Sequence, residues 1–183
     1  MKRTKVLLAA LLSATVVLGG VIPAHAAQNS EVTIEVKATT MDRVSVTVPG
    51  TLPIIFNEDG TNTLPSSWTI QNVSTIAGIH LDRIDMDSKE AGWKLLAASE
   101  DTKSLAADTK SIQFYAGNTG ALKLVAPNSG TESTTGSVSF GASEISIPSG
   151  DTKVISFDVN RGAFTTAEAA AKAFDMVLTF EFN

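Results

Sequence analysis

Four acidic side chains close together in the chain are the first place where metal chemistry could occur. They are Asp82, Asp85, Asp87 and Glu90. Hard cations such as Ca²⁺ prefer several oxygen ligands from one flexible segment, so these residues are candidate ligands for a divalent ion. The spacing does not match an EF-hand loop, because counting from Asp85 puts Lys89 at the fifth position and no glycine at the sixth. A solvated loop explains the same residues without an ion, and we assign no metal site.

Catalysis would have to use His80, since it is the only histidine left once an N-terminal signal segment is removed. The chain has no cysteine and no G-x-S-x-G sequence, which excludes thiolate zinc sites and the nucleophile elbow. His80 lies between Ile79 and Leu81, so we expect it at the surface or rim of a strand, on the face opposite these two residues. Two of the carboxylates could form a glycosidase pair, but the sequence does not place any two of them ~5–9 Å apart. We therefore expect no catalytic residue, no cofactor and no enzymatic activity.

Signals for phosphate and sugar binding are weak. The segment Gly117–Gly120 lacks the lysine and the length of a P-loop and is typical of a hairpin turn. Asn72-Val73-Ser74 matches the glycosylation sequon, a pattern short enough to occur by chance. Trp68 could stack on a sugar if it were exposed, but a core position is the favoured interpretation for a tryptophan in a β-sandwich.

Alternation of apolar and polar residues predicts that the elements carrying these side chains are half-buried strands. A break in the alternation at Asp82-Arg83 predicts a β-bulge. Residues 128–137 contain no large apolar side chain and predict an exposed hairpin loop. About ten strands at this regular spacing predict an all-β fold, an antiparallel β-sandwich. The clearest alternating segments are Val32–Val36, Val44–Val48, Leu52–Phe56, Ile79–Met86, Val154–Val159 and Phe174–Phe182.

One short α-helix is predicted directly before the last strand, from about Thr166 to Ala173. Thr165 and Glu168 have the spacing of a capping box, and the alanines between them and the strand are strong helix formers. A crossover that delivers the last strand is the favoured role, and a functional lid is the alternative. The last strand itself is predicted to belong to the core, because five large apolar residues share one of its faces. These are Phe174, Met176, Leu178, Phe180 and Phe182.

The first 26 residues have the three parts of a secretory signal peptide. Lys2, Arg3 and Lys5 precede an uncharged, mostly apolar run from Val6 to Val21, and Ala24-His25-Ala26 offers the small residues that a signal peptidase needs. The apolar run is shorter than the ~20 residues that span a bilayer. We predict cleavage after Ala26, with a retained N-terminal anchor as the alternative.

Residues 27–183 are then expected to form a single domain, a length that suits one sizeable core. Removal of the signal segment takes away three basic residues and no acidic one, so the net charge of −5 becomes −8. A surface this acidic repels nucleic acid and anionic lipid headgroups. No second apolar stretch approaches the length of a membrane span, so we expect no membrane insertion after processing.

Three short segments in sequence resemble the WxL domain of Gram-positive cell-surface proteins, in which W-x-V, Asp-Arg and G-W-x-L follow one another. They are Trp68–Asn72, Asp82-Arg83 and Gly92–Leu95, in which Trp93 and Leu95 match the first motif of that family. Phenylalanine takes the place of the family's C-terminal tryptophan motif in the last strand. Residues 44–72 also look like repeated surface-protein modules of Firmicutes. The resemblance implies non-covalent attachment to the cell wall and a non-enzymatic role.

These observations favour a secreted, non-enzymatic module that acts by binding or adhesion at the cell surface or cell wall. Its expected partners are a cell-wall polymer or other surface proteins. A subunit of an extracellular fibre or pilus-like assembly is the first alternative, because Val32–Val36 or Phe174–Phe182 could pair with a neighbouring subunit. A secreted hydrolase is the second alternative, and it requires a pocket that unites His80 or two carboxylates.

Overall fold

The computed structural model describes residues 30–39, 45–57, 59–89, 92–165 and 171–183. This part of the chain forms fifteen strands in two mixed sheets, and its one helical element is a 3₁₀ turn at Thr102–Ser104. The expected all-β class is confirmed. None of the helical structure in these ranges is long and apolar enough to cross a membrane. The predicted signal segment and its cleavage site lie outside the described residues.

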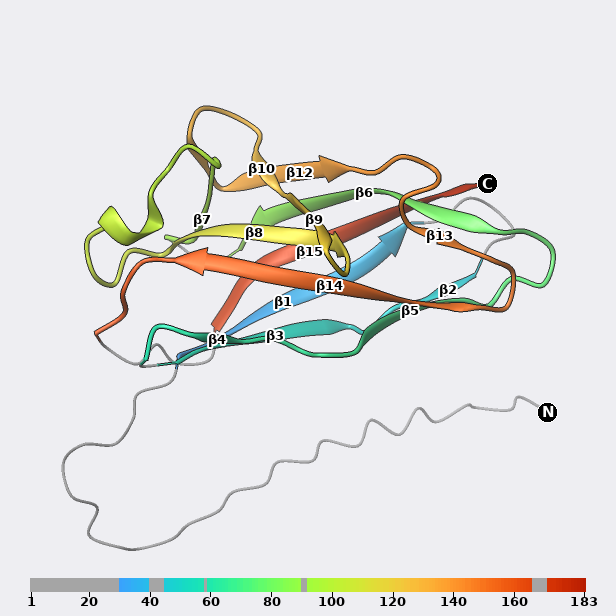
Figure 1. Cartoon of the computed structure of the whole chain (residues 1–183), viewed down its shortest axis with the longest axis horizontal. Helices are drawn as coiled ribbons and strands as arrows, with labels where there is room; N and C mark the ends of the chain where they lie inside the picture. The colour runs from blue at the N-terminus through green and yellow to red at the C-terminus, as the bar shows by residue number, and fades with distance from the viewer. Residues whose placement is uncertain (1–29, 40–44, 58, 90–91, 166–170) are drawn as a thin grey trace, which may run out of the picture.

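The larger sheet contains eight strands and has the order β10-β12-β6-β15-β1-β3-β4, with β13 also paired to β6. Both terminal strands of the described chain, β1 and β15, therefore lie side by side in its interior (Figure 1). Its members are β1 (Ser30–Thr39), β3 (Thr51–Phe56), β4 (Asn62–Thr63), β6 (Ile79–Ser88), β10 (Ala126–Pro127), β12 (Thr135–Ser139), β13 (Ser146–Ile147) and β15 (Ala171–Phe182).

The smaller sheet contains seven strands in the order β11-β7-β8-β14-β5-β2, with β9 also paired to β8. Figure 1 shows its long strand β14 crossing in front of β15 and β1 of the larger sheet. Its members are β2 (Val46–Thr47), β5 (Trp68–Asn72), β7 (Lys94–Leu96), β8 (Ser111–Asn118), β9 (Ala121–Leu124), β11 (Glu132–Ser133) and β14 (Thr152–Arg161).

One hydrophobic core receives side chains from both sheets. The Trp93 ring lies at its centre and is 1% exposed, with ring centroids 5.9 Å from Phe56 and 6.3 Å from Phe174. The last strand contributes as predicted, because Phe174, Met176, Leu178 and Phe180 are all buried. Phe182 is the exception: it is 40% exposed. The alternation of β15 thus brings four of its five apolar side chains into the core.

The sheets are mixed, so the expectation of purely antiparallel pairing is wrong. β15 is antiparallel to β6 and parallel to β1, and β7 is parallel to β8. The parallel pairing of β15 with β1 follows from the place of β15 in the sheet. Its neighbours β6 and β1 run in opposite directions, so a strand between them must be parallel to one of the two.

The helix expected before the last strand is not formed at positions 171–173, the part of its range that the structure describes. Positions 171–173 are the first residues of β15, where Lys172 pairs with Thr33 of β1. Ala173 is 1% exposed there, because its side chain joins the core. Pairing with β1 outweighs the helix propensity of these alanines, which is worth only tenths of a kcal/mol per residue. Positions 166–170, which include Glu168 of the predicted capping box, lie outside the described residues, and the Thr165 hydroxyl donates instead to the Asp108 carboxylate (2.5 Å).

Two local predictions in the middle of the chain are confirmed and one is corrected. The pairing of β15 with β6 shifts register between Thr179 and Phe180, which face Arg83 and Leu81, so Asp82 is the extra residue of the predicted bulge. The turn at 117–120 joins antiparallel strands β8 and β9. Residues 128–137, expected as an exposed hairpin loop, do connect an antiparallel pair, β10 and β12, but they also contain β11 and the start of β12. Both short segments pair at the outer edges of β7 and β6, where polar strands can lie without joining the core.

Candidate binding groove

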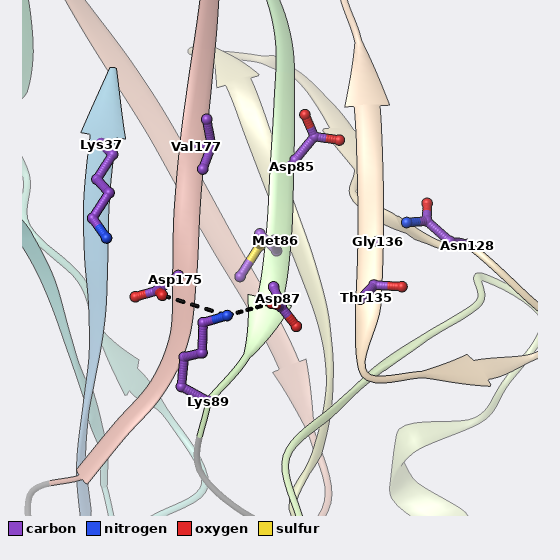
Figure 2. A pocket seen from close by; sticks show the side chains of 10 residues that line it. All are labelled: Lys37, Asp85, Met86, Asp87, Lys89, Asn128, Thr135, Gly136, Asp175 and Val177. Carbon is purple, nitrogen blue, oxygen red and sulfur yellow. Dashed lines mark hydrogen bonds and ion pairs between the residues drawn. The ribbon is translucent and has the colours of Figure 1, made fainter. Parts of the chain in front are cut away.

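A groove of about 270 Å³ lies on the solvent face of the larger sheet, over β1, β15, β6 and β12. Figure 2 shows Lys89 between Asp87 and Asp175. Five charged side chains line the groove, from three of these strands and from the residue after β6. They are Lys37, Asp85, Asp87, Lys89 and Asp175. Thr135 and Asn128 add a hydroxyl and an amide on the β12 side.

Strand alternation explains why the charges gather on this face. On β15 the buried Phe174 and Met176 point into the core, so Asp175 between them points to solvent. On β6 the buried Ile84 and Met86 have the same effect on the aspartates beside them. The register then aligns the two strands, because Asp87 faces Asp175 directly.

Basic side chains neutralise the carboxylates in the groove, and Asp85 pairs with Arg83, whose Nε lies 2.8 Å from Asp85 Oδ2. The Lys89 ammonium contacts the Asp87 carboxylate and lies 3.7 Å from Asp175 Oδ2, as the dashed lines in Figure 2 show. A second lysine, Lys172, lies with its Nζ 2.7 Å from Asp175 Oδ1 and also contacts Glu35 of β1. The face therefore presents alternating positive and negative groups rather than a field of one sign.

The pKa values follow these contacts. Partial burial of Asp175 opposes its ionisation, but the hydrogen bond and charge of Lys172, with the charges of Lys37 and Lys89, outweigh this and lower the pKa of Asp175. The hydrogen bond to Asp87 raises the pKa of Lys89. The bond to Asp175 does the same for the pKa of Lys172. These pKa shifts hold Asp175, Lys89 and Lys172 in their charged forms near neutral pH.

The candidate metal ligands that the structure describes do not form one cluster. Asp85 and Asp87 line the groove, where lysines neighbour the carboxylates. Asp82 is the bulged residue and instead lies near His80 and Glu181. Glu90 lies outside the described residues. Asp82 thus belongs to a different group of side chains from Asp85 and Asp87, farther along β6.

His80 is on the outer face of β6 as expected, but it is not a surface side chain. It is 6% exposed and its Nδ1 lies 3.2 Å from Asn183 Oδ1. Its position on β6 is five residues from Asp85, which is about 17 Å of extended strand. The histidine is therefore too distant to act as a general base in the groove.

The residues that carry the family resemblance are core residues. Trp93 is 1% exposed and Leu95 is fully buried, so neither offers a surface to a ligand. Trp68 is also buried, as expected, with its ring packed edge-on against Phe157 at 5.3 Å between centroids. Asn72 of the glycosylation sequon is fully buried and its amide donates to three backbone carbonyls, so the folded chain does not present it for modification.

The sequence did not point to Lys37, Lys89, Asn128, Thr135 or Asp175 as members of a site. A polar residue between two core residues, as at Asp175, is ordinary strand alternation and gives no functional signal by itself. Only the order of the strands brings these side chains together. Of the four carboxylates that the sequence singled out as candidate ion ligands, Asp85 and Asp87 line one side of the groove.

No family model matches the chain, and neither the curated proteins nor the solved structures that were compared give a match. The function is therefore argued from the groove and its chemistry.

Proposed function

We propose that this protein is an exported, non-enzymatic cell-surface module of the β-sandwich type, which binds a cell-wall polymer in the groove on the larger sheet. The observation that carries the proposal is the convergence of both charge signs with an amide and a hydroxyl on one solvent face. Export rests on the signal segment at residues 1–26, and N-terminal sequencing of secreted protein should return Ala27 as the first residue.

The chemistry of the groove suits a polymer that carries hydroxyl, amino and carboxylate groups. Asp85 and Asp87 can accept hydrogen bonds from hydroxyl or ammonium groups, and Lys37 and Lys89 can donate to carboxylates. Hydrogen bonds to charged groups are the stronger ones, about 1.5–3 kcal/mol each. A cell-wall polymer offers many such groups along one extended chain, which matches an arrangement spread over four strands.

The size of the groove also favours part of a polymer over a whole small ligand. Its volume of about 270 Å³ lies just below the ~300–1,000 Å³ range of pockets that enclose drug-sized molecules. A site of this size can hold one segment of a longer chain while the remainder extends over the sheet. Repeated segments on the wall would then offer many equivalent positions for the single groove of each chain.

Asp87 and Asp175 are the pair that a hydrolase would require, because residues directly opposite on antiparallel strands have Cβ atoms ~4.5–5.5 Å apart. A glycosidase acid, however, needs a raised pKa, whereas the pKa of Asp175 is lowered. Lys89 also lies between the two carboxylates. These features support binding over hydrolysis.

For the fibre alternative, the pairing of the terminal strands is the relevant observation. β1 has β15 on one side and β3 on the other, and β15 lies between β6 and β1. Neither strand offers a free edge to a neighbouring subunit in this arrangement. Assembly by strand exchange would require one of them to leave the sheet, so we favour the wall-binding proposal.

Sedimentation with washed Gram-positive cell wall tests the proposal. The secreted chain should sediment with wall material, and Lys89→Gln should weaken binding about 10-fold or more, since one charge-assisted contact is worth about 1.5–3 kcal/mol. Wall stripped of anionic polymers should be compared with intact wall, to separate the glycan from its attached polymers. Melting temperatures of both proteins establish that the variant is folded.

Lys94→Gln is the matched control, because Lys94 is 44% exposed against 45% for Lys89 and pairs with Glu132 on the other sheet. Its wall binding should equal that of the unmodified chain. Equal loss in both lysine variants, or no binding to either wall preparation, would overturn the groove as the binding site. Release of reducing sugar ends from wall material would replace the proposal with the hydrolase, and filaments in electron micrographs of the secreted protein would replace it with the fibre.

A further inference from the structure

A second group of side chains converges at the opposite end of β6, away from the groove. His80 and the bulged Asp82 come from β6, and Glu181 of β15 faces His80 in the strand pairing. One ligand atom from each lies within 4.8 Å of one from each of the others. In the part of the chain that the structure describes, this is the one group of three or more such side chains that could share a metal ion.

The orientation of the His80 ring is fixed by a neighbour that is not itself a ligand. Asn183 donates from Nδ2 to Ser146 Oγ of β13 at 2.8 Å, which turns its Oδ1 toward His80 Nδ1 at 3.2 Å. The Asn183 oxygen can only accept, so Nδ1 carries the ring proton. The other nitrogen, Nε2, then presents a lone pair. Metal-binding histidines are held in this way, with one nitrogen donating to an oxygen and the other free for the metal.

The free nitrogen points to a carboxylate that it cannot bond. His80 Nε2 and Glu181 Oε2 are 4.0 Å apart, too far for a hydrogen bond. The His80 side chain is 7% exposed, whereas Glu181 is 56% exposed and can rotate. Among the residues that the structure describes, no lysine or arginine forms an ion pair with Asp82 or Glu181. A divalent cation between the His80 imidazole and these two carboxylates would satisfy all three.

We propose that His80, Asp82 and Glu181 bind a single divalent transition-metal ion of the zinc class. Imidazole with carboxylates suits Zn²⁺ and its neighbours, whereas Ca²⁺ prefers oxygen ligands alone. Zinc lies ~2.0–2.2 Å from such ligands. The half-buried Asp82 and the exposed Glu181 must therefore move inward by about 1 Å or more around a fixed His80. Three protein ligands leave a fourth position for water or for a group from a partner.

The bulge at Asp82 lets one face of β6 carry both groups of side chains. His80 and Asp82 are two residues apart and share the outer face by ordinary alternation, whereas Asp82 and Asp85 are three residues apart and would lie on opposite faces of a regular strand. The extra residue returns Arg83, Asp85 and Asp87 to the outer face. This site does not depend on the proposed wall binding, since no residue is shared with the groove.

Isothermal titration calorimetry with ZnCl₂ tests the proposal, using secreted protein without a histidine tag after treatment with a chelator. We expect one Zn²⁺ per chain, a higher melting temperature with zinc, and no comparable effect of CaCl₂. Glu181→Gln, at an exposed position, should weaken zinc binding at least 10-fold without a change in fold. His80→Gln should abolish binding, and Co²⁺ absorbance should lose its nitrogen-ligand signature in that variant.

Asp87→Asn is the control, because Asp87 lies in the groove about seven residues along the same strand, and it should keep the zinc affinity of the unmodified chain. If zinc fails to bind, or binds equally to the Glu181 variant, the site is refuted. Wall sedimentation of the Glu181 variant should be normal, so failure of this proposal and failure of the groove proposal remain distinguishable. If His80→Gln does not fold, Asp82→Asn and Glu181→Gln decide the result.

Discussion

Asp87 and Asp175 face each other across the antiparallel pair of β6 and β15, and the Lys89 ammonium lies between their carboxylates. Like charges directly opposite one another destabilise a sheet. Lys89 and Lys172 offset this repulsion and hold Asp175 ionised although its side chain is only 13% exposed. The arrangement links the stability of the central strands to pH and to the same residues that line the groove.

Acidification should therefore destabilise the protein through Asp175. Its folded pKa is lowered, so its stabilising contribution is complete above the unfolded carboxyl pKa of ~3.9 and is lost as the pH falls below that value. Glu35, Glu132 and Glu144 share this direction, because hydrogen bonds from lysines lower the pKa of each. Urea denaturation between pH 7 and pH 3 should show a falling free energy of unfolding below about pH 4.5. Asp175→Asn should flatten the slope, and an unchanged slope in that variant would contradict the assignment.

Trp93→Ala should destabilise the fold by ~3–5 kcal/mol, because it removes a fully buried ring that contacts Phe56, Phe164 and Phe174. Thermal melting and urea denaturation measure the loss. Ile76→Ala is the control, since Ile76 is 71% exposed and its truncation should change stability by less than ~0.5 kcal/mol. A Trp93 variant that keeps its melting temperature but loses wall binding would make this residue a ligand contact instead.

Gly136→Ala should be strongly destabilising although it adds a single methyl group. A Cβ at this position of β12 would lie 2.6 Å from the Ala126 carbonyl oxygen and 2.6 Å from Leu95 Cδ1. The β12 backbone would have to move away from Ala126 of β10, and the Leu95 side chain would have to move aside, at a cost of ~1–3 kcal/mol for overpacking. Gly50→Ala is the matched control, because nothing lies within 4 Å of a Cβ built there. Equal melting temperatures for the two variants would show that β12 can move away from Leu95 freely.

Removal of residues 174–183 should unfold the domain. Phe174, Met176, Leu178 and Phe180 are buried, and burial of each is worth ~1.5–3 kcal/mol, so their loss approaches the ~5–15 kcal/mol net stability of a domain. Loss of β15 would also open the edges of β6 and β1. Circular dichroism and amide exchange report the result. A truncated chain that refolds only when a peptide of residues 174–183 is added in trans would support strand exchange between subunits.

Much of the local structure followed from the sequence alone. Alternation at every second position identified the strands and their inner faces, because a side chain on a strand points to one face or the other with a fixed period of two. The same rule predicted the bulge at Asp82 and the buried face of the last strand. These features depend on residues a few positions apart, so they are encoded locally.

The tertiary structure decided which strands pair, and therefore which side chains meet in the groove and which meet around His80. The Asn183 amide that orients His80 lies 103 residues along the chain from it, and nothing in either local sequence encodes their contact. Asp82 was grouped with Asp85 and Asp87 because it is their neighbour in sequence, but the sheet register sends it to Glu181 instead. Lys172 and Ala173 have local helix propensity worth only tenths of a kcal/mol, and the burial and strand pairing of β15 outweigh it. Strand order is a long-range property, and only the folded chain fixes it.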